Sequence, residues 1–309
     1  MRALDLARQW YESSGKPMLE REFGDVVDRI AVGRVGRGSE CFGYDDAISR
    51  DHDFVIGFSL WITGEDEREF GFRLERAYAR LRREFPPESA SGASSALGDA
   101  EHGVMRIGDF YRRHLGFPGA PEDWRQWLYT PESAFAEATN GQVFRDDLGT
   151  FSAIRRTILS DMPEDVRRKK LACRAVFMAQ SGQYNFSRCL RHGEPGAAAL
   201  ALAEFVRSAV SMIFLLNRRF SPYYKWQFRA MRELPSLSEL APELETLLVR
   251  ELPDGEKIDR IERVCARIAA ELRAQNLSDC TEAYLEPHAF SIMAGIRDRE
   301  LRELHVMEG

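Results

Sequence analysis

The spacing of apolar residues changes along the chain near residue 150. Before that point, short apolar runs punctuated by glycine stand between helical segments. After it, apolar positions recur at helical spacing, and glycine and proline separate the segments. The pattern predicts an α+β fold, with a mixed-sheet domain at residues 1–148 followed by an α-helical bundle domain at residues 149–309.

The first part combines helical and strand patterns. Strands are predicted near Ile30 to Val35, Asp53 to Ile62 and Gly141 to Asp146, where β-branched or continuously apolar runs are bounded by glycine or aspartate. Helices are predicted over 4–11, 18–28, 65–85 and 132–138, with short elements around 105–111 and 124–129. The small polar residues of Pro86 to Gly103 predict a surface loop.

The second part is helical in pattern almost throughout. Its predicted helices are 151–159, 164–191, 195–219, 223–234, 237–250, 256–274 and 287–304. Short connections between them are typical of a helical bundle.

Composition sets limits on location and partners. The 309 residues carry a net charge of -6, so a nucleic-acid partner is not expected. Five widely spaced cysteines indicate neither a disulfide framework nor a zinc site. The longest apolar run, Ala209 to Leu216, is far shorter than the roughly 20 residues of a membrane span. We therefore expect a soluble cytoplasmic protein with no membrane partner.

One passage combines glycine, serine and paired carboxylates. Gly38 and Ser39 follow the first predicted strand and offer backbone N–H groups and a hydroxyl to a phosphate. Asp51 and Asp53 open the second predicted strand, where residues two apart project from the same face. Two adjacent carboxylates favour a cation, and Mg²⁺ prefers such oxygen ligands together with those of a nucleoside triphosphate.

The order of these features resembles the DNA polymerase beta-like nucleotidyltransferase superfamily. In that pattern a strand ends in Gly-Ser, a connection of about a dozen residues follows, and D-x-D opens the next strand. The runs GSECFGYDDAISRDHDF, VFRDDLGTF and NRRFSPYYKW are also similar to an uncharacterised bacterial family known only as a domain of unknown function.

The resemblance implies magnesium-dependent nucleotidyl transfer. Asp51 and Asp53 hold Mg²⁺, and a third carboxylate from a later strand completes the site and helps to deprotonate an acceptor hydroxyl. The match for it is Asp146, with Asp147 as the competitor, since a one-residue slip in register exchanges the two. The expected nucleotide is ATP, and the acceptor is a hydroxyl of an unidentified small molecule or protein.

The helical part supplies candidate contacts for the triphosphate. Lys225 lies in the first turn of a helix that a proline begins, beside aromatic residues, where it either clamps a phosphate or lies as a surface lysine along Trp226. Tyr184 and Arg188 fall near one helical face and are further candidates. Three alternatives stay open: a non-catalytic nucleotide sensor, a toxin–antitoxin type enzyme that modifies protein or RNA, and an interaction scaffold.

Overall fold

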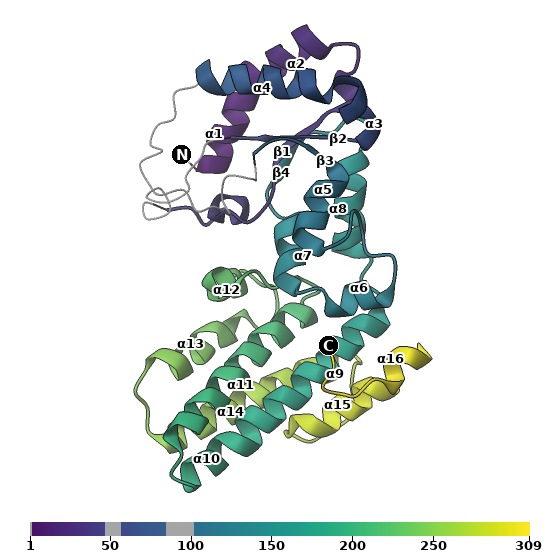
Figure 1. Ribbon diagram of the computed structural model, residues 1–309. Coiled ribbons are helices and arrows are strands. Elements are labelled where there is room, and N and C mark those ends of the chain that lie inside the picture. Colours follow the sequence, from purple (N-terminus) through teal and green to yellow (C-terminus); the bar gives the residue numbers. More distant parts are fainter. Residues whose placement is uncertain (1, 47–56, 85–101) are drawn as a thin grey trace. The chain divides into compact units, whose positions relative to one another are not determined.

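The computed structural model describes residues 2–46, 57–84 and 102–309, which fold into two compact units (Figure 1). The first comprises Met1–Glu122 and Ala134–Asp161, and the second comprises Asp123–Ser133 and Met162–Gly309. The first unit thus extends past the predicted boundary at residue 148. Asp51, Asp53 and nearly all of the loop predicted at 86–103 lie outside the described residues.

A mixed sheet lies inside the first unit. Its strands are β1 (Ala31–Arg34), β2 (Ser59–Ile62), β3 (Gly103–Arg106) and β4 (Gln142–Arg145), in the order β3-β2-β1-β4. β1 is antiparallel to β2 and to β4, so Gly33 pairs with both Ser59 and Val143. β2 and β3 are parallel, with Ser59 beside Gly103. The strands predicted around β1 and β4 are confirmed, and β2 confirms the end of the strand predicted over 53–62.

Helical segments surround this sheet. They are α1 (Ala3–Trp10), the π-helix η1 (Tyr11–Gly15), α2 (Lys16–Phe23), η2 (Val27–Arg29), η3 (Ser39–Phe42), α3 (Gly64–Asp66), the π-helix η5 (Glu67–Gly71), α4 (Phe72–Glu84), α5 (Ile107–Leu115), α7 (Glu132–Thr139) and α8 (Thr150–Ser160).

The amino-terminal helices and α4 pack on one face of the sheet. Trp10 of α1 lies with its ring 4.8 Å from that of Phe58, which precedes β2. Tyr78 of α4 donates a hydrogen bond of 2.6 Å to the Phe58 carbonyl. Leu60 and Ile62 of β2 point into the same cluster, because alternate residues of a strand share a face.

The residue between them, Trp61, points to the opposite face and is fully buried. Its ring stacks on Phe151 of α8 at 4.1 Å, and Phe110 of α5 meets it edge-on at 5.4 Å. Tyr111 donates to the Phe151 carbonyl at 3.2 Å. These contacts explain why α8 belongs to the sheet-containing unit, although the apolar pattern from residue 150 onward is entirely helical.

The second unit is helical. Its elements are α6 (Trp124–Tyr129), α9 (Glu164–Met178), the π-helix η6 (Ala179–Phe186), α10 (Ser187–Arg191), α11 (Pro195–Leu216), α12 (Tyr224–Met231), η7 (Ser238–Leu240), α13 (Ala241–Val249), α14 (Asp254–Ala274), α15 (Leu285–Ala294) and α16 (Arg299–Glu303). The long helices α9, α11 and α14 run through the bundle (Figure 1).

The central helix α11 is the most apolar. By length and composition it could cross a membrane, but 61% of its most apolar window is buried within the protein. Phe205, Ala209, Met212 and Ile213 of this helix have no exposed surface. This burial fits the core helix of a soluble protein, as predicted for its apolar end.

A capping interaction divides the last predicted helix. The segment expected as one helix over 287–304 forms α15 and α16, which are separated by Gly295–Asp298. Asp165 of α9 accepts the backbone N–H groups of Arg297 at 3.0 Å and Asp298 at 2.7 Å. Asp298 then accepts from Leu301 N–H at 3.0 Å as the N-cap of α16.

Candidate functional site

The turn that leaves β1 is anchored by the residues that enter β4. Asn140 accepts the Gly36 N–H at 3.0 Å and donates to the Gly36 carbonyl at 2.7 Å. Gly141 N–H donates to the Cys41 carbonyl at 2.8 Å. Gly141 has φ 63° and lies against the Arg34 carbonyl, so a side chain there would collide with the backbone. The turn therefore has a fixed backbone path.

Gly38 and Ser39, the predicted phosphate contacts, lie in this turn. Gly38 is extended with φ −64° and ψ 147°, and Ser39 opens the short 3₁₀-helix η3. Cys41 N–H donates to the Gly38 carbonyl at 3.0 Å, and Tyr44 N–H donates to the Ser39 carbonyl at 2.9 Å. A Cβ at Gly38 would overlap the Glu40 carboxylate, so any larger residue there would require the Glu40 side chain to shift.

A buried arginine lies directly behind the turn. Arg34, the last residue of β1, is 4% exposed and donates to the Glu40 carboxylate, with 3.1 Å between Nε and Oε1. It also contacts His102, with 2.7 Å between an Arg34 terminal nitrogen and Nε2. Burial, together with the charges of Arg34 and Arg82, holds the pKa of His102 well below its ordinary value. The imidazole is therefore neutral near pH 7, and Arg34 compensates the acidic side chain beside Gly38.

Strand directions bring four chain segments to one edge of the sheet, the one formed by the end of β1 and the starts of β2, β3 and β4. The turn at 35–39 leaves β1 there, and Gly57 and Phe58 enter antiparallel β2 at the same edge. His102 enters β3, which is parallel to β2. Asn140 and Gly141 enter β4, which is antiparallel to β1. A Cβ at Gly57 would lie 3.2 Å from His102 Nδ1, so two of these segments are in contact.

Asp146 and Asp147 lie at the opposite edge of the sheet, the one formed by the start of β1 and the end of β4. They follow β4, whose last residue, Arg145, pairs with Val32 near the start of β1. The length of β1, about 10 Å, therefore separates them from the edge that carries the turn. Asp146 accepts the Ser152 N–H of α8 at 2.7 Å, and Asp147 forms an ion pair with Arg145. The structure does not bring Asp146 together with Gly38 and Ser39.

The metal prediction depends on residues that the structure does not describe. Asp51 and Asp53 are outside the described ranges. Within residues 2–46, 57–84 and 102–309, no group of three or more His, Cys, Asp or Glu side chains is arranged to hold a metal ion. The assignment of Mg²⁺ to Asp51, Asp53 and Asp146 therefore stays a prediction.

The candidate phosphate contacts of the helical part belong to the second unit. Lys225 Nζ lies 5.1 Å from the centre of the Trp226 ring, and the Arg229 guanidinium lies 6.0 Å from the same ring. This contact fits the interpretation in which the lysine lies along Trp226. Beside it, Tyr224 is 70% exposed, and its ring lies 4.2 Å from that of Tyr223.

Tyr184 and Arg188 form a local pair. Arg188 donates to the Tyr184 hydroxyl at 2.9 Å, and its guanidinium lies 5.5 Å from the centre of the tyrosine ring. Tyr184 is in the π-helix η6 and Arg188 is one turn later in α10. Their contact with a nucleotide stays a prediction.

β3 and the residues that enter it were not predicted from the sequence. Four residues with glycine at the first position are too short to give a strand period, and they follow a polar low-complexity stretch. The available signal was the run HGVMRI, in which Val104 and Met105 are adjacent apolar residues followed by Arg106 and Ile107.

Comparisons with known proteins extend this description only a little. Residues 127–227 match a family model described as "Domain of unknown function (DUF4037)". The matched region begins within α6, ends within α12 and covers about one third of the chain. No curated protein and no solved structure matches the chain.

Proposed function

We propose that this chain is a cytoplasmic, magnesium-dependent nucleotidyltransferase that moves AMP from ATP to a hydroxyl acceptor with release of pyrophosphate. One observation carries the proposal: antiparallel β1 and β2 put the Gly38–Ser39 turn at the sheet edge where β2 begins. Asp53 stands four residues before Gly57 in the sequence, and Asp51 stands six before it. In the sequence, the Gly-Ser pair follows β1 and the D-x-D pair precedes β2, the strand that pairs directly with β1.

Each candidate has a chemical role. Backbone N–H groups and the hydroxyl at Gly38 and Ser39 bind phosphate oxygens, and Arg34 lowers the cost of placing them beside Glu40. Asp51 and Asp53 hold magnesium, which when bound neutralises charge on the triphosphate. Lys225, Tyr184 and Arg188 of the second unit stay predicted contacts for the remaining phosphates or the base. The acceptor hydroxyl loses its proton to a carboxylate, attacks the α-phosphorus in line and displaces pyrophosphate.

The third carboxylate has two candidates, Asp146 and the neighbouring Asp147, and both follow from the resemblance. Both residues follow β4, at the edge opposite the Gly38–Ser39 turn. Two variants separate them: Asp146→Asn abolishes turnover if Asp146 is the third carboxylate, and Asp147→Asn abolishes it if Asp147 is.

Calorimetric titration tests the site without a known acceptor. ATP, GTP, CTP and UTP are titrated into the full chain with and without Mg²⁺, and into an Asp51→Asn, Asp53→Asn double variant. The control is Asp25→Asn, Asp28→Asn, which removes the same charge from exposed positions of the first unit. We expect magnesium-dependent binding of ATP in the wild type and the control, and its loss in the double variant.

Other outcomes select the alternatives. Equal binding to all three proteins would reject the assignment of Asp51 and Asp53. Tight binding with no pyrophosphate release across a panel of hydroxyl acceptors would favour a nucleotide sensor. No nucleotide binding at all would favour an interaction scaffold.

A second candidate function, modification of an RNA end, is favoured by a local charge pattern. Asn217 to Arg232 contains five cationic residues and no carboxylate, although the whole chain has a net charge of -6. Tyr223 and Tyr224 are exposed in the same stretch, and proteins bind single strands with such cation–aromatic surfaces. Salt-dependent binding of a labelled RNA 20-mer that Tyr224→Ala weakens would support this function. Absence of binding at low salt would reject it.

A further inference from the structure

A cavity of about 530 Å³ opens in the second unit where α9 begins and the α15–α16 connection passes. Its walls include Trp124, Pro163, Arg168, Arg297 and Leu301. The volume lies within the range of small-molecule sites, about 300–1,000 Å³. We propose that this cavity binds a small aromatic molecule that carries an oxyanion, with the anionic group against Arg168 and Arg297.

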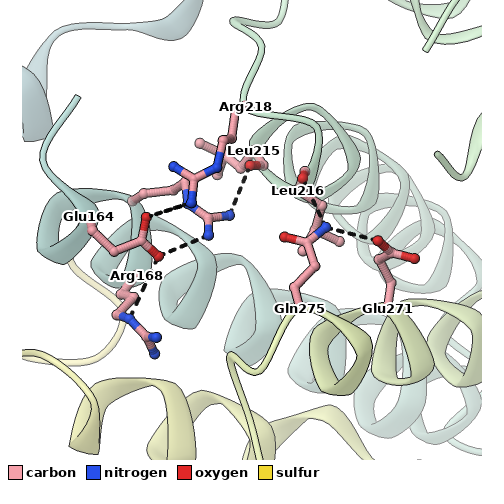
Figure 2. Close-up of polar contacts among 8 residues, drawn as sticks. Glu164, Arg168, Leu215, Leu216, Arg218, Glu271 and Gln275 are labelled. Atoms are coloured by element: carbon pink, nitrogen blue, oxygen red, sulfur yellow. Dashed lines mark hydrogen bonds and ion pairs between the residues drawn. The ribbon is translucent and has the colours of Figure 1, made fainter. Parts of the chain in front are cut away.

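Three carboxylates line the cavity, and each already has a donor. Glu164 accepts from Arg167 at 2.8 and 3.0 Å and from Arg218 at 2.9 Å (Figure 2). Although burial raises the pKa of Glu164, these hydrogen bonds and charges bring it below its ordinary value. Asp165 accepts the two backbone N–H groups of the α15–α16 connection, and Asp298 accepts the Leu301 N–H. All three carboxylates thus accept hydrogen bonds from protein groups and do not require a cationic ligand.

The side chains of Arg168 and Arg297 have N–H groups that make no hydrogen bond with the described residues. Arg168 approaches Glu164 only at 3.7 Å through Nε, and its terminal nitrogens make no hydrogen bond with the described residues. Figure 2 shows the end of this guanidinium directed away from Glu164, toward the carboxy-terminal segment. The Arg297 side chain is exposed and likewise has no partner among the described residues. Two guanidinium groups on one cavity match a planar oxyanion.

Gly295 creates the space for Arg168. A Cβ at this position would come within 2.6 Å of an Arg168 terminal nitrogen, closer than real Cβ contacts allow. The Arg168 guanidinium therefore lies close to the backbone of Gly295. A single methyl group at residue 295 would displace the guanidinium without changing any charge.

The apolar wall favours a ring. Trp124 lines the cavity together with Pro163 and Leu301, and the Arg125 guanidinium lies 4.2 Å from the centre of the Trp124 ring. Flat apolar surfaces beside paired cations suit a benzoate-like or phenyl phosphate-like molecule.

Ligand-observed NMR titration tests the proposal on the full chain without nucleotide or magnesium. The probes are benzoate and phenyl phosphate, with inorganic phosphate as the ringless anion and benzamidine as the ring of opposite charge. We expect millimolar or tighter dissociation constants for benzoate or phenyl phosphate, and at least tenfold weaker binding of the two control probes. Preference for one of the two aromatic anions identifies the oxyanion.

Variants connect the binding to this cavity. Arg168→Gln and Gly295→Ala are each expected to weaken it about tenfold, and Arg297→Gln provides an exposed second position if either fails to fold. Arg207→Gln on α11, which removes an exposed arginine paired with Glu204, should have no effect. Benzamidine binding as tightly as benzoate, or aromatic anions that bind all cavity variants equally, would overturn the proposal.

Discussion

The Asn140 side chain forms hydrogen bonds with both backbone polar groups of Gly36: it accepts the N–H at 3.0 Å and donates to the carbonyl at 2.7 Å. The two residues are 104 positions apart in the sequence. A side-chain amide that bonds to the N–H and the C=O of one residue pairs both groups as a neighbouring strand would, at the point where the sheet ends. It thereby fixes the turn that carries Gly38 and Ser39.

Replacement of this amide should loosen the turn. Asn140→Ala removes both hydrogen bonds, and we expect about 1–3 kcal/mol less stability in urea unfolding. Asn140→Asp retains one acceptor oxygen but places the other carboxylate oxygen against the Gly36 carbonyl, so a loss at least as large is expected. Equal stability of wild type and Asn140→Ala would mean that the turn is held by other contacts.

His102 should make stability depend on pH. Its pKa is well below 6.5 in the folded protein, because of burial and the charges of Arg34 and Arg82, while the unfolded chain titrates near 6.5. The unfolded state therefore binds the proton first, and stability is lost as the pH falls below about 6.5 toward the folded pKa. Titration of His102 can change the free energy of unfolding by at most about 1.4 kcal/mol per pH unit. The wild type should show this extra loss between pH 7 and 5, and His102→Asn should not; parallel curves would contradict the assignment.

Lys169 should anchor the carboxy-terminal segment. Its side chain is fully buried and donates to the carbonyls of His305 at 2.7 Å, Val306 at 3.4 Å and Glu308 at 2.6 Å. Lys169→Met retains the apolar stem and removes the donors, which should cost about 2–3 kcal/mol. Hydrogen exchange of residues 303–309 should accelerate in this variant. The exposed Lys16→Met is the control, and unchanged exchange would show that the ammonium is not the anchor.

Gly182 should be intolerant of a side chain. It lies in the π-helix η6 with the Phe205 ring directly over its Cα, and an added Cβ would collide with that ring. We expect Gly182→Ala to lower the free energy of unfolding by about 1–3 kcal/mol through overpacking. The matched control is Gly196→Ala near the start of α11, where no atom lies within 4 Å of the added Cβ. Gly196→Ala is expected to be neutral or stabilising, because alanine reduces the entropy of the unfolded chain and favours the helix. Similar losses in both variants would contradict the ring contact as the cause.

The elements that the sequence predicted correctly are those with their own periodicity. β1 is a buried run of Ala31, Val32 and Gly33 before Arg34, and α11 is apolar over most of its length, so local pattern was sufficient. The division of the 287–304 helix depends on Asp165, more than 130 residues away, and no local pattern contains that hydrogen bond. Long-range polar contacts were the part that could not be predicted.

The site shows the same distinction. Gly38 and Ser39 were placed correctly at a strand end, because glycine and serine after an apolar run are a local signal. The position of Asp146 relative to them depends on whether β4 is parallel or antiparallel to β1. Side-chain type and spacing are identical in either direction, so only the folded chain could assign the edge.

The insertion of Asp123–Ser133 in the sequence of the first unit limits how the protein can be dissected. Leu128 of this piece contacts Gly309, and Glu132 accepts a hydrogen bond of 3.0 Å from Ser211 of α11, so the bundle needs residues made some 30 positions before α9. If the gene is split at any single position, one of the two fragments lacks a segment that belongs to its own compact unit. During synthesis, the first unit is complete at residue 161, whereas the helices of the second unit that follow α6 in the chain have not yet been made. Fragment expression therefore calls for circular permutation or co-expression rather than simple truncation.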